Sequence, residues 1–405
     1  MKTIAIVGAG YRCYHNFATN LHAYFSDKVK FVGICDPNFK RGEYYRKTID
    51  PEIRLYRDFD KMLAECKPDA VLVTTVDRYH HEYIVRALRA GFDVYSEKPL
   101  TIDEEKCLAI RQAEKESGKR VIVTFNCRFM PYIVRVKELL NRGVIGRPLT
   151  VNYEYTLNRV HGGDYFKRWH RFMENCGGML VHKSTHHFDI VNWLLEDDPV
   201  SVCAMGSRLY YGREDRPHGE RCSTCEYKET CDSYEDLSQD TEVQELYFRA
   251  ESEDGYQRDH CVFQKDTDIY DAMSVSVSYE KGAILTYSLN LFSTREGYRI
   301  SITGEKGRIE AEDYFIEENP EPYNVIKVLR FDGSSEQYTF PKPKGTHAGA
   351  DLPMLSMLFG DAPDKLGQCS DSFDGVKSAM IGIAANRSIR EGRRIDVKEI
   401  LEKMK

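Results

Sequence analysis

The first residues that could do chemistry form a glycine-rich turn near the N-terminus. The stretch Val7-Gly8-Ala9-Gly10-Tyr11-Arg12-Cys13 follows a short apolar run and has G-x-G-x-x-G spacing, with Cys13 in place of the third glycine. The first glycine of such a turn permits its tight geometry, the second lets a pyrophosphate approach the backbone, and the third allows close helix–strand packing. Cysteine is small enough to keep the packing role. We therefore predict a dinucleotide site, with its phosphates at a helix N-terminus.

An acidic residue stands where this site needs one. Asp36 ends the second apolar run, where a carboxylate would accept hydrogen bonds from the adenosine ribose hydroxyls. A carboxylate there favours NAD over NADP because it repels a 2′-phosphate. Lys40 and Arg41 follow closely and leave NADP open.

A cluster of cysteines indicates a second kind of chemistry. The candidate ligands are Cys222, Cys225, Cys231 and Cys261. A C-x-x-C turn directs two thiolates at one ion, so four thiols predict a tetrahedral structural zinc site. His218 or His260 could replace one cysteine, and an iron–sulfur cluster uses the same ligand type. The alternative interpretation is a surface loop with free thiols.

A third group of residues is suited to sugar binding. It consists of His161, Asp164, Tyr165, Arg168 and Trp169. Aromatic faces can stack on the C–H surface of a sugar, and polar groups can bind its hydroxyls. The alternative is an exposed polar loop anchored by a buried tryptophan.

The elements that must position these residues fall into two patterns. Residues 1–126 alternate short Val- and Ile-rich runs with helical patterns, which predicts a parallel sheet of the Rossmann type. The runs lie at 4–7, 31–35, 70–76, 94–95 and 121–125, with helices expected over 82–90 and 103–117.

Residues 127–405 predict a second, α+β domain with a large, mainly antiparallel sheet. After a helix over 131–141, strands are expected at 149–157, 272–279, 283–291, 298–303 and 307–310. Hairpin turns are expected at 280–282 and 304–307, and helices over 370–392 and 397–404. The polar, cysteine-rich stretch from about 211 to 262 is predicted to be an insertion.

Composition excludes several classes of protein. The chain has 405 residues, with 57 Lys and Arg against 64 Asp and Glu, so its net charge is −7. Such a mildly acidic chain without a basic block is a poor candidate for nucleic-acid binding. No apolar run is long enough to span a membrane, and the start lacks the pattern of an export signal. We predict a cytoplasmic protein whose twelve cysteines are free thiols or metal ligands.

Several motifs together resemble a known family. They are Gly8-Ala9-Gly10-Tyr11-Arg12, Thr74-Thr75 with His80, Glu97-Lys98-Pro99, Arg128-Phe129, Gly143-Val144-Ile145-Gly146, Gly177-Gly178 through Asp189, and Gly382-Ile383-Ala384-Ala385-Asn386. Over nearly its whole length the chain resembles the Gfo/Idh/MocA family, which includes glucose-fructose oxidoreductase and inositol dehydrogenase. The resemblance implies a Rossmann domain, an α/β domain with a large sheet, and a homo-oligomer (dimer or tetramer) formed through that sheet.

The resemblance also implies roles for single residues. Lys98 would lie beside the nicotinamide and polarise the reacting hydroxyl, and His186 would exchange its proton. Candidate cofactor contacts are Gly8, Gly10, Tyr11, Arg12, Cys13, Asp36, Thr75, His80, Glu97 and Lys98. Lys183 and His347 join the candidate substrate contacts. His80 is also open to a structural interpretation.

The second signature departs from the family. His182 stands where the family generally has Asp, and Ser184 where it generally has Gly. His182 is therefore a candidate to orient the base or the substrate. His182, His186 and Asp189 are expected on one helix face at i, i+4 and i+7. The two histidines also have the spacing of helical zinc ligands, so metal-assisted alcohol oxidation is an alternative.

Together these observations predict an NAD(P)-dependent oxidoreductase. It would move a hydride between the nicotinamide and a secondary hydroxyl of a carbohydrate or glycoside. Two alternatives are a glycosidase that retains NAD and works through transient oxidation, and a sugar sensor that binds the dinucleotide without catalysis.

Overall fold

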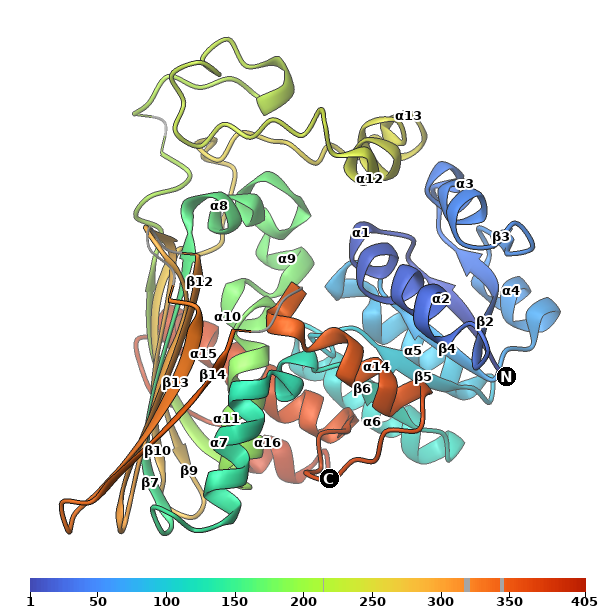
Figure 1. Ribbon diagram of the computed structural model, residues 1–405. Coiled ribbons are helices and arrows are strands. Elements are labelled where there is room, and N and C mark those ends of the chain that lie inside the picture. Colours follow the sequence, from blue (N-terminus) through green and yellow to red (C-terminus); the bar gives the residue numbers. More distant parts are fainter. Residues whose placement is uncertain (214, 317–320, 343–345) are drawn as a thin grey trace.

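Two sheets on either side of a helical layer make up the structure. The computed structural model describes residues 1–213, 215–316, 321–342 and 346–405. Figure 1 shows the N-terminal sheet and the larger C-terminal sheet with helices between them, and a long insertion at the top. None of the helices in these ranges is long and apolar enough to cross a membrane.

The N-terminal sheet has seven strands in the order β15-β6-β5-β4-β1-β2-β3. Neighbours among β1 to β6 pair in parallel, as alternating strands and helices predict. Ile4, Ile6, Val71 and Leu72 are fully buried, which is why their runs are continuously apolar. The elements are β1 (Lys2–Val7), α1 (Tyr11–Cys13), α2 (Thr19–Phe25), β2 (Val29–Cys35), α3 (Phe39–Thr48), β3 (Arg54–Tyr56), α4 (Phe59–Cys66), β4 (Ala70–Val73), α5 (His80–Arg89), β5 (Asp93–Ser96), α6 (Glu104–Ser117) and β6 (Val121–Val123).

The second sheet has nine strands in the order β14-β13-β12-β11-β7-β10-β9-β8-β16. Its neighbours are antiparallel except β7 and β10, which are parallel. The elements before the insertion are α7 (Pro131–Asn141), β7 (Pro148–Asn158), α8 (Arg159–Lys167), α9 (Met173–Cys176), α10 (Met179–His182), α11 (Thr185–Leu195) and β8 (Pro199–Ser207). Those after it are β9 (Ala272–Tyr279), β10 (Ile284–Ser293), β11 (Glu296–Gly304), β12 (Gly307–Ile316), β13 (Tyr323–Arg330), β14 (Ser335–Pro341), α14 (Asp351–Phe359), β15 (Ser370–Asp371), α15 (Ser372–Glu391), β16 (Ile395–Asp396) and α16 (Lys398–Glu402).

The predicted fold class is confirmed, including both hairpins. The turn at 280–282 joins β9 to β10, and the turn at 304–307 joins β11 to β12. Strands β13 and β14 were not expected. In β14 the exposed positions Ser335, Gln337 and Thr339 are polar, and in β13 Lys327 interrupts the apolar run. Strand β15 pairs antiparallel with β6, so the C-terminal segment returns to the N-terminal sheet. The boundary at residue 126 stays a prediction.

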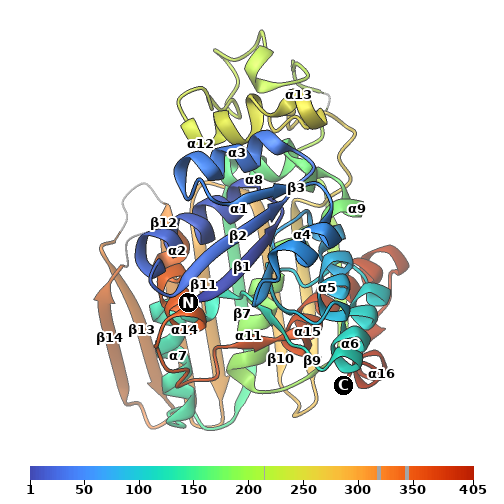
Figure 2. The same ribbon diagram turned by 90° about the vertical axis from the view of Figure 1, so that its right-hand side faces the viewer.

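The predicted insertion lies mostly outside both sheets. Its regular elements are short: α12 (Thr241–Val243), a π turn (Gln244–Phe248) and α13 (Glu251–Asp254). Figure 2 shows α12 and α13 lying above α3. Glu214 is outside the described residues.

The contact between α8 and β10 gives a test of the fold. A Cβ on Gly162 would lie 1.8 Å from the carbonyl oxygen of Leu291, whereas a Cβ on Gly163 would come no closer than 3.5 Å to Tyr211. We expect Gly162→Ala to lower the free energy of unfolding by about 1–3 kcal/mol, because the backbones must separate. Gly163→Ala, the matched control, should leave it unchanged or raise it by up to ~1 kcal/mol. Urea unfolding measures both, and equal stability of the two variants would contradict the packing described.

Candidate active site

The glycine-rich turn has the geometry that its sequence predicts. Gly8 follows β1 with φ +93°, and a Cβ there would lie 2.7 Å from the carbonyl of Thr74 at the end of β4. Helix α1 begins at Tyr11. Burial raises the pKa of the Cys13 thiol to about 11, so this residue packs as a small uncharged group.

Asp36 lies at the end of β2 and faces this turn. Its carboxylate accepts hydrogen bonds from the backbone N–H groups of Ala9, at 2.7 Å, and Asn38, at 2.8 Å. Burial raises the pKa of Asp36, while Arg41, 3.7 Å away, opposes that shift. The carboxylate therefore joins β2 to the fingerprint turn, where the sequence predicted a ribose contact.

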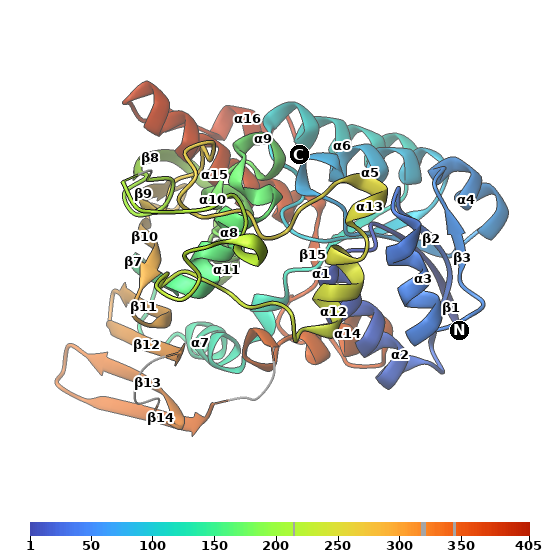
Figure 3. The ribbon, with the colours of Figure 1, turned by 90° about the horizontal axis from the view of Figure 1, so that it is seen from above.

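The insertion reaches across this turn, a contact that the sequence did not predict. The backbone N–H of Tyr11 donates to the Tyr247 hydroxyl at 3.0 Å. The side chain of Asn38 donates to the Ala250 carbonyl, and Arg41 donates to the Leu246 carbonyl. Figure 3 shows α12 and α13 beside α1 and α3. We call residues 241–254 the strap.

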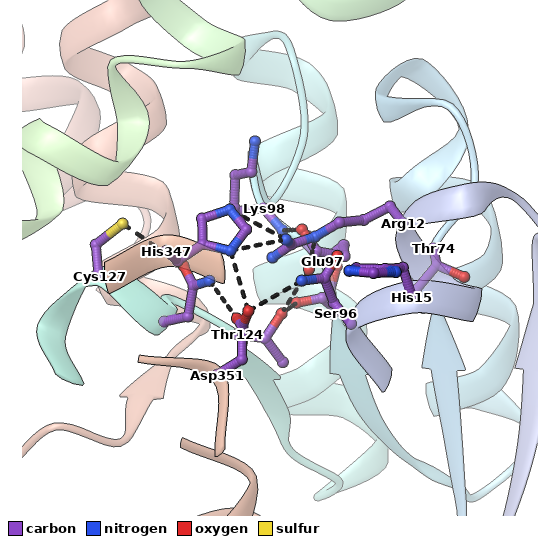
Figure 4. A network of polar contacts seen from close by, with 12 residues as sticks. Arg12, His15, Thr74, Ser96, Glu97, Lys98, Thr124, Cys127, His347 and Asp351 are labelled. Carbon is purple, nitrogen blue, oxygen red and sulfur yellow. Dashed lines mark hydrogen bonds and ion pairs between the residues drawn. The ribbon is translucent and has the colours of Figure 1, made fainter. Parts of the chain in front are cut away.

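A network of charged groups connects the turn to the Glu97-Lys98-Pro99 motif (Figure 4). Arg12 Nε lies 3.0 Å from Glu97 Oε1, and the Lys98 N–H donates to Glu97 Oε2 at 3.1 Å. Arg12 Nη1 also contacts the His347 ring, at 3.2 Å, and His347 Nδ1 lies 3.1 Å from Asp351. Arg12 Nη2 is buried without a hydrogen-bond partner among the described residues.

Lys98 is held next to His182. Its ammonium donates to the His182 carbonyl at 3.2 Å and lies 3.5 Å from His182 Nε2. Burial lowers the pKa of Lys98 to about 8, although Glu97 and Asp77 oppose the shift. The other ring nitrogen of His182 lies 2.6 Å from Asp77. Asp77 was not predicted as a site residue. Its only signal in the sequence is that it is a polar residue soon after Thr74-Thr75.

The predicted single helix face for His182, His186 and Asp189 is wrong. Helix α10 ends at His182 and α11 begins at Thr185, so the axis breaks between them. His182 turns to Asp77, while Asp189 forms a buried bidentate pair with Arg128 at 2.6 and 2.8 Å. His186 pairs with neither Asp77 nor Arg128, and its ring lies edge-on to the ring of Phe125.

His186 lines a cavity of about 480 Å³ between the Rossmann domain and the large sheet. Burial, with the charges of Lys98 and Lys183, holds the pKa of His186 well below its usual value, so the imidazole is neutral at neutral pH. Its Nδ1 atom has no partner among the described residues. The other lining residues are Tyr11, His15, Asn16, Cys127, Met130, Tyr155, His161, Lys183, His187, Glu296, Tyr298, Asp313, Phe315, Ile316, Lys342, His347 and Ala348.

The predicted substrate residues fall into two neighbouring groups, joined by a 3.2 Å contact between His161 Nε2 and the Tyr165 hydroxyl. His161, Lys183 and His347 line the cavity. Tyr165 and Trp169 lie next to His182 instead, with ring centroids 5.5 and 5.8 Å from it.

Asp164 and Arg168 form an ion pair beside the second group. Burial opposes ionisation, but Arg168 and Arg258 lower the pKa of Asp164 to about 2. Asp164 is therefore a charged partner of two arginines, and its role toward substrate stays a prediction.

His80 is buried and bridges two backbone carbonyls. Its ring nitrogens lie 2.8 Å from the Pro99 oxygen and 3.1 Å from the Thr75 oxygen. This bridge ties the end of β4 to the Lys98 turn, which favours the structural interpretation of His80.

The predicted metal sites are not supported. Within residues 1–213, 215–316, 321–342 and 346–405, no group of three or more His, Cys, Asp or Glu side chains is arranged to hold a metal ion. Cys222, Cys225, Cys231 and Cys261 do line one small cavity, so the spacing brought them together without forming the expected zinc or iron–sulfur site. His182 and His186 diverge, which also removes the alternative of a helical zinc pair.

Comparison with known proteins identifies the class and then the family. The protein-family model described as "Oxidoreductase family, NAD-binding Rossmann fold" matches residues 2–125. A second family model, "Oxidoreductase family, C-terminal alpha/beta domain", matches residues 137–397. These matches and the two-sheet fold define an NAD(P)-dependent oxidoreductase. The chain belongs to the Gfo/Idh/MocA family, so the resemblance read from its motifs is confirmed.

The relatives agree with this assignment. "Putative oxidoreductase YteT" of Bacillus subtilis (strain 168) is 33% identical over 426 aligned residues, which cover 99% of each chain. "Inositol 2-dehydrogenase" of Paracoccus denitrificans (strain Pd 1222) is 31% identical over 188 residues, 46% of this chain and 51% of that one. The WlbA dehydrogenase from Bordetella pertussis, solved with NADH and UDP-GlcNAcA, shares the fold with a TM-score of 0.67 at 20% identity, covering 97% of this chain and 98% of that one.

The contact between the strap and the turn gives a test of cofactor entry. A pyrophosphate that bonds the Tyr11 N–H must displace the Tyr247 hydroxyl, which also lies 3.5 Å from the Cβ position of Gly10. Tyr247→Phe removes this competitor, so we expect NADH to bind about 2- to 10-fold more tightly, the range for one neutral hydrogen bond. NADH fluorescence titration measures the affinity. Tyr227→Phe removes a hydroxyl elsewhere in the insertion and serves as control; weaker binding by Tyr247→Phe would show that Tyr247 helps hold the cofactor.

Proposed function

We propose that this chain is an NAD-dependent dehydrogenase acting on a secondary hydroxyl of a carbohydrate or glycoside. The observation that carries the proposal is the placement of Lys98 and His186. An ammonium with a lowered pKa and a neutral imidazole lie close enough for the charge of Lys98 to depress the pKa of His186. Such a pair can stabilise an oxygen on which negative charge develops and accept its proton.

The residues around the glycine-rich turn fit a bound dinucleotide. The turn has the required positive φ at Gly8, and Arg12 keeps a buried guanidinium nitrogen that has no partner among the described residues. NAD is preferred to NADP in this proposal because both nearby cations are already engaged. Lys40 donates to Ser252 and to the Arg249 carbonyl, and Arg41 pairs with Asp254.

In the proposed mechanism each side chain has one task. When bound, the nicotinamide supplies the acceptor for hydride. Lys98 binds the reacting hydroxyl and stabilises the charge on its oxygen, while the imidazole of His186 accepts its proton. His182 positions Lys98 through its carbonyl and Nε2, and Asp77 orients His182. Carbohydrate specificity is assigned to the cavity and the aromatic and charged residues beside it.

The large sheet is proposed to mediate homo-oligomerisation. Alternate positions of β9 and β10 are exposed within this chain, and Figure 1 shows no helix on that outer face. A dimer or tetramer formed through this face stays a prediction, as does the cytoplasmic location.

A second candidate is the glycosidase that retains NAD. The strap over the cofactor turn favours it, because a covered cofactor exchanges slowly. The decisive experiment releases and identifies any bound nucleotide, then follows the absorbance of reduced nicotinamide with sugars and glycosides. Net reduction in step with one sugar supports the dehydrogenase, whereas glycoside cleavage without net reduction supports the second candidate. A sensor without catalysis is disfavoured because Lys98 and His186 are both present.

The role of Lys98 is tested by its removal. We expect Lys98→Met to lower turnover at least about 10²-fold, the scale for losing one group that stabilises the developing oxyanion. NADH affinity, measured by fluorescence, should change little because the glycine-rich turn is intact. Turnover close to that of the parent protein would remove Lys98 from the mechanism.

The pH dependence follows from the same residue. Lys98 is charged below its pKa of about 8, so a role as an ammonium predicts that kcat/KM falls as pH rises through about 8. The pKa of His186 lies well below its usual value, so the imidazole is already neutral near neutral pH and its titration does not limit kcat/KM there. Lys98→Arg keeps the charge and should lose the alkaline decline, whatever its absolute rate. An unchanged alkaline limb in Lys98→Arg would assign that limb to another group.

A further inference from the structure

We infer that the substrate carries a carboxylate and that Lys183 binds it, so that the pocket selects an acidic sugar over its neutral counterpart. The inference rests on the proposed function and names the substrate class for that site.

Lys183 is the residue that separates α10 from α11, and it lines the same cavity as His186. Its ammonium lies over the Tyr155 ring, 5.2 Å from the centroid. It makes no hydrogen bond or ion pair with any residue that the structure describes. The cation–π contact steadies the ammonium but leaves its charge uncompensated.

The carboxylates of the cavity wall are already engaged with other groups. Glu296 lies 2.7 Å from His161 and accepts a hydrogen bond from Asn158 at 2.9 Å. Asp313 lies 3.9 Å from Lys342, whose ammonium also donates to the Tyr314 carbonyl.

Asp351, beside His347, is engaged in the same way. It accepts hydrogen bonds from Asn126 at 2.6 Å and Asn16 at 3.0 Å. Each acid is therefore already engaged within the chain, Glu296 and Asp351 through hydrogen bonds and Asp313 through an ion pair. This leaves Lys183 to pair with a group from outside the chain.

The neighbours of Lys183 add positive charge. Lys183, Lys98 and Arg12 all lower the pKa of His186, so their charges act on one small region. A partly buried cation in such surroundings gains most from an anionic ligand, because charge-assisted hydrogen bonds are roughly twice as strong as neutral ones. A sugar carboxylate at Lys183 would leave a ring hydroxyl free for His186, which lines the same 480 Å³ cavity and whose pKa is lowered by the nearby charge of Lys98.

The test compares acidic sugars with their neutral counterparts. The probes are D-galacturonate against D-galactose, D-glucuronate against D-glucose, and the methyl glycosides of all four. We expect kcat/KM at least about 10-fold higher for the acid of the preferred pair, as for one charged hydrogen bond. Equal or better turnover of the neutral sugar overturns the inference while leaving the proposed function standing. Where no sugar is oxidised, the proposed function fails, and calorimetric binding of the same uronates and hexoses decides the inference by the same preference.

Variants locate the preference within the cavity. Lys183→Met should lower kcat/KM for the acid about 10- to 100-fold, mainly through KM, and change the neutral sugar less than about 2-fold. Lys183→Arg keeps the charge and should restore part of the preference. Lys342 lines the same cavity but is paired with Asp313, so it serves as the control. Lys342→Met should leave the ratio of kcat/KM for the acid to kcat/KM for the neutral sugar unchanged. Equal losses for both sugars in Lys183→Met, or loss of the ratio in Lys342→Met instead, would overturn the assignment to Lys183.

Discussion

The ion pair between Arg12 and Glu97 is the interaction on which the site depends. It joins the first helix after the glycine-rich turn to the end of β5, with 28% and 5% of the two side chains exposed. Removing either partner would leave the other charge partly buried and uncompensated. Through Glu97 the pair fixes the backbone of Lys98, and through Arg12 it reaches His347 (Figure 4). The glycine-rich turn, Lys98 and His347 are therefore joined by one network of contacts.

Burial does the rest of the electrostatic tuning. It lowers the pKa of Lys98 to about 8 and keeps His186 neutral. Lys98 belongs to the Rossmann domain, whereas His186 belongs to the C-terminal α/β domain. In water an ammonium and an imidazole would differ in pKa by about four units. In the protein the imidazole of His186 is neutral at neutral pH, while Lys98, with a pKa of about 8, is still mainly an ammonium there.

The insertion has too little apolar surface to form a core of its own. Polar contacts hold it together internally, such as Arg221 with Glu251 and Asp259. The strap is held against the Rossmann domain by contacts with Asn38 and Arg41. The strap takes support from Asn38 and Arg41 of the Rossmann domain, and it contacts the glycine-rich turn through the Tyr247 hydroxyl. Cys222, Cys225, Cys231 and Cys261 line one small cavity of the insertion, and no metal-holding group is found among the described residues.

Local patterns in the sequence determined the Rossmann sheet, the antiparallel second sheet and the family, because strand period, turn glycines and short motifs act between near neighbours. Lys98, His186 and the turn could be named from those motifs. The break between α10 and α11, the partnership of His182 with Asp77, and the contact of Tyr247 with Tyr11 could not. The two contacts join residues about 100 to 240 positions apart, so only the packing of the tertiary structure decided which polar groups meet. The same packing sets the Lys183 ammonium over the Tyr155 ring, with no hydrogen bond or ion pair among the described residues.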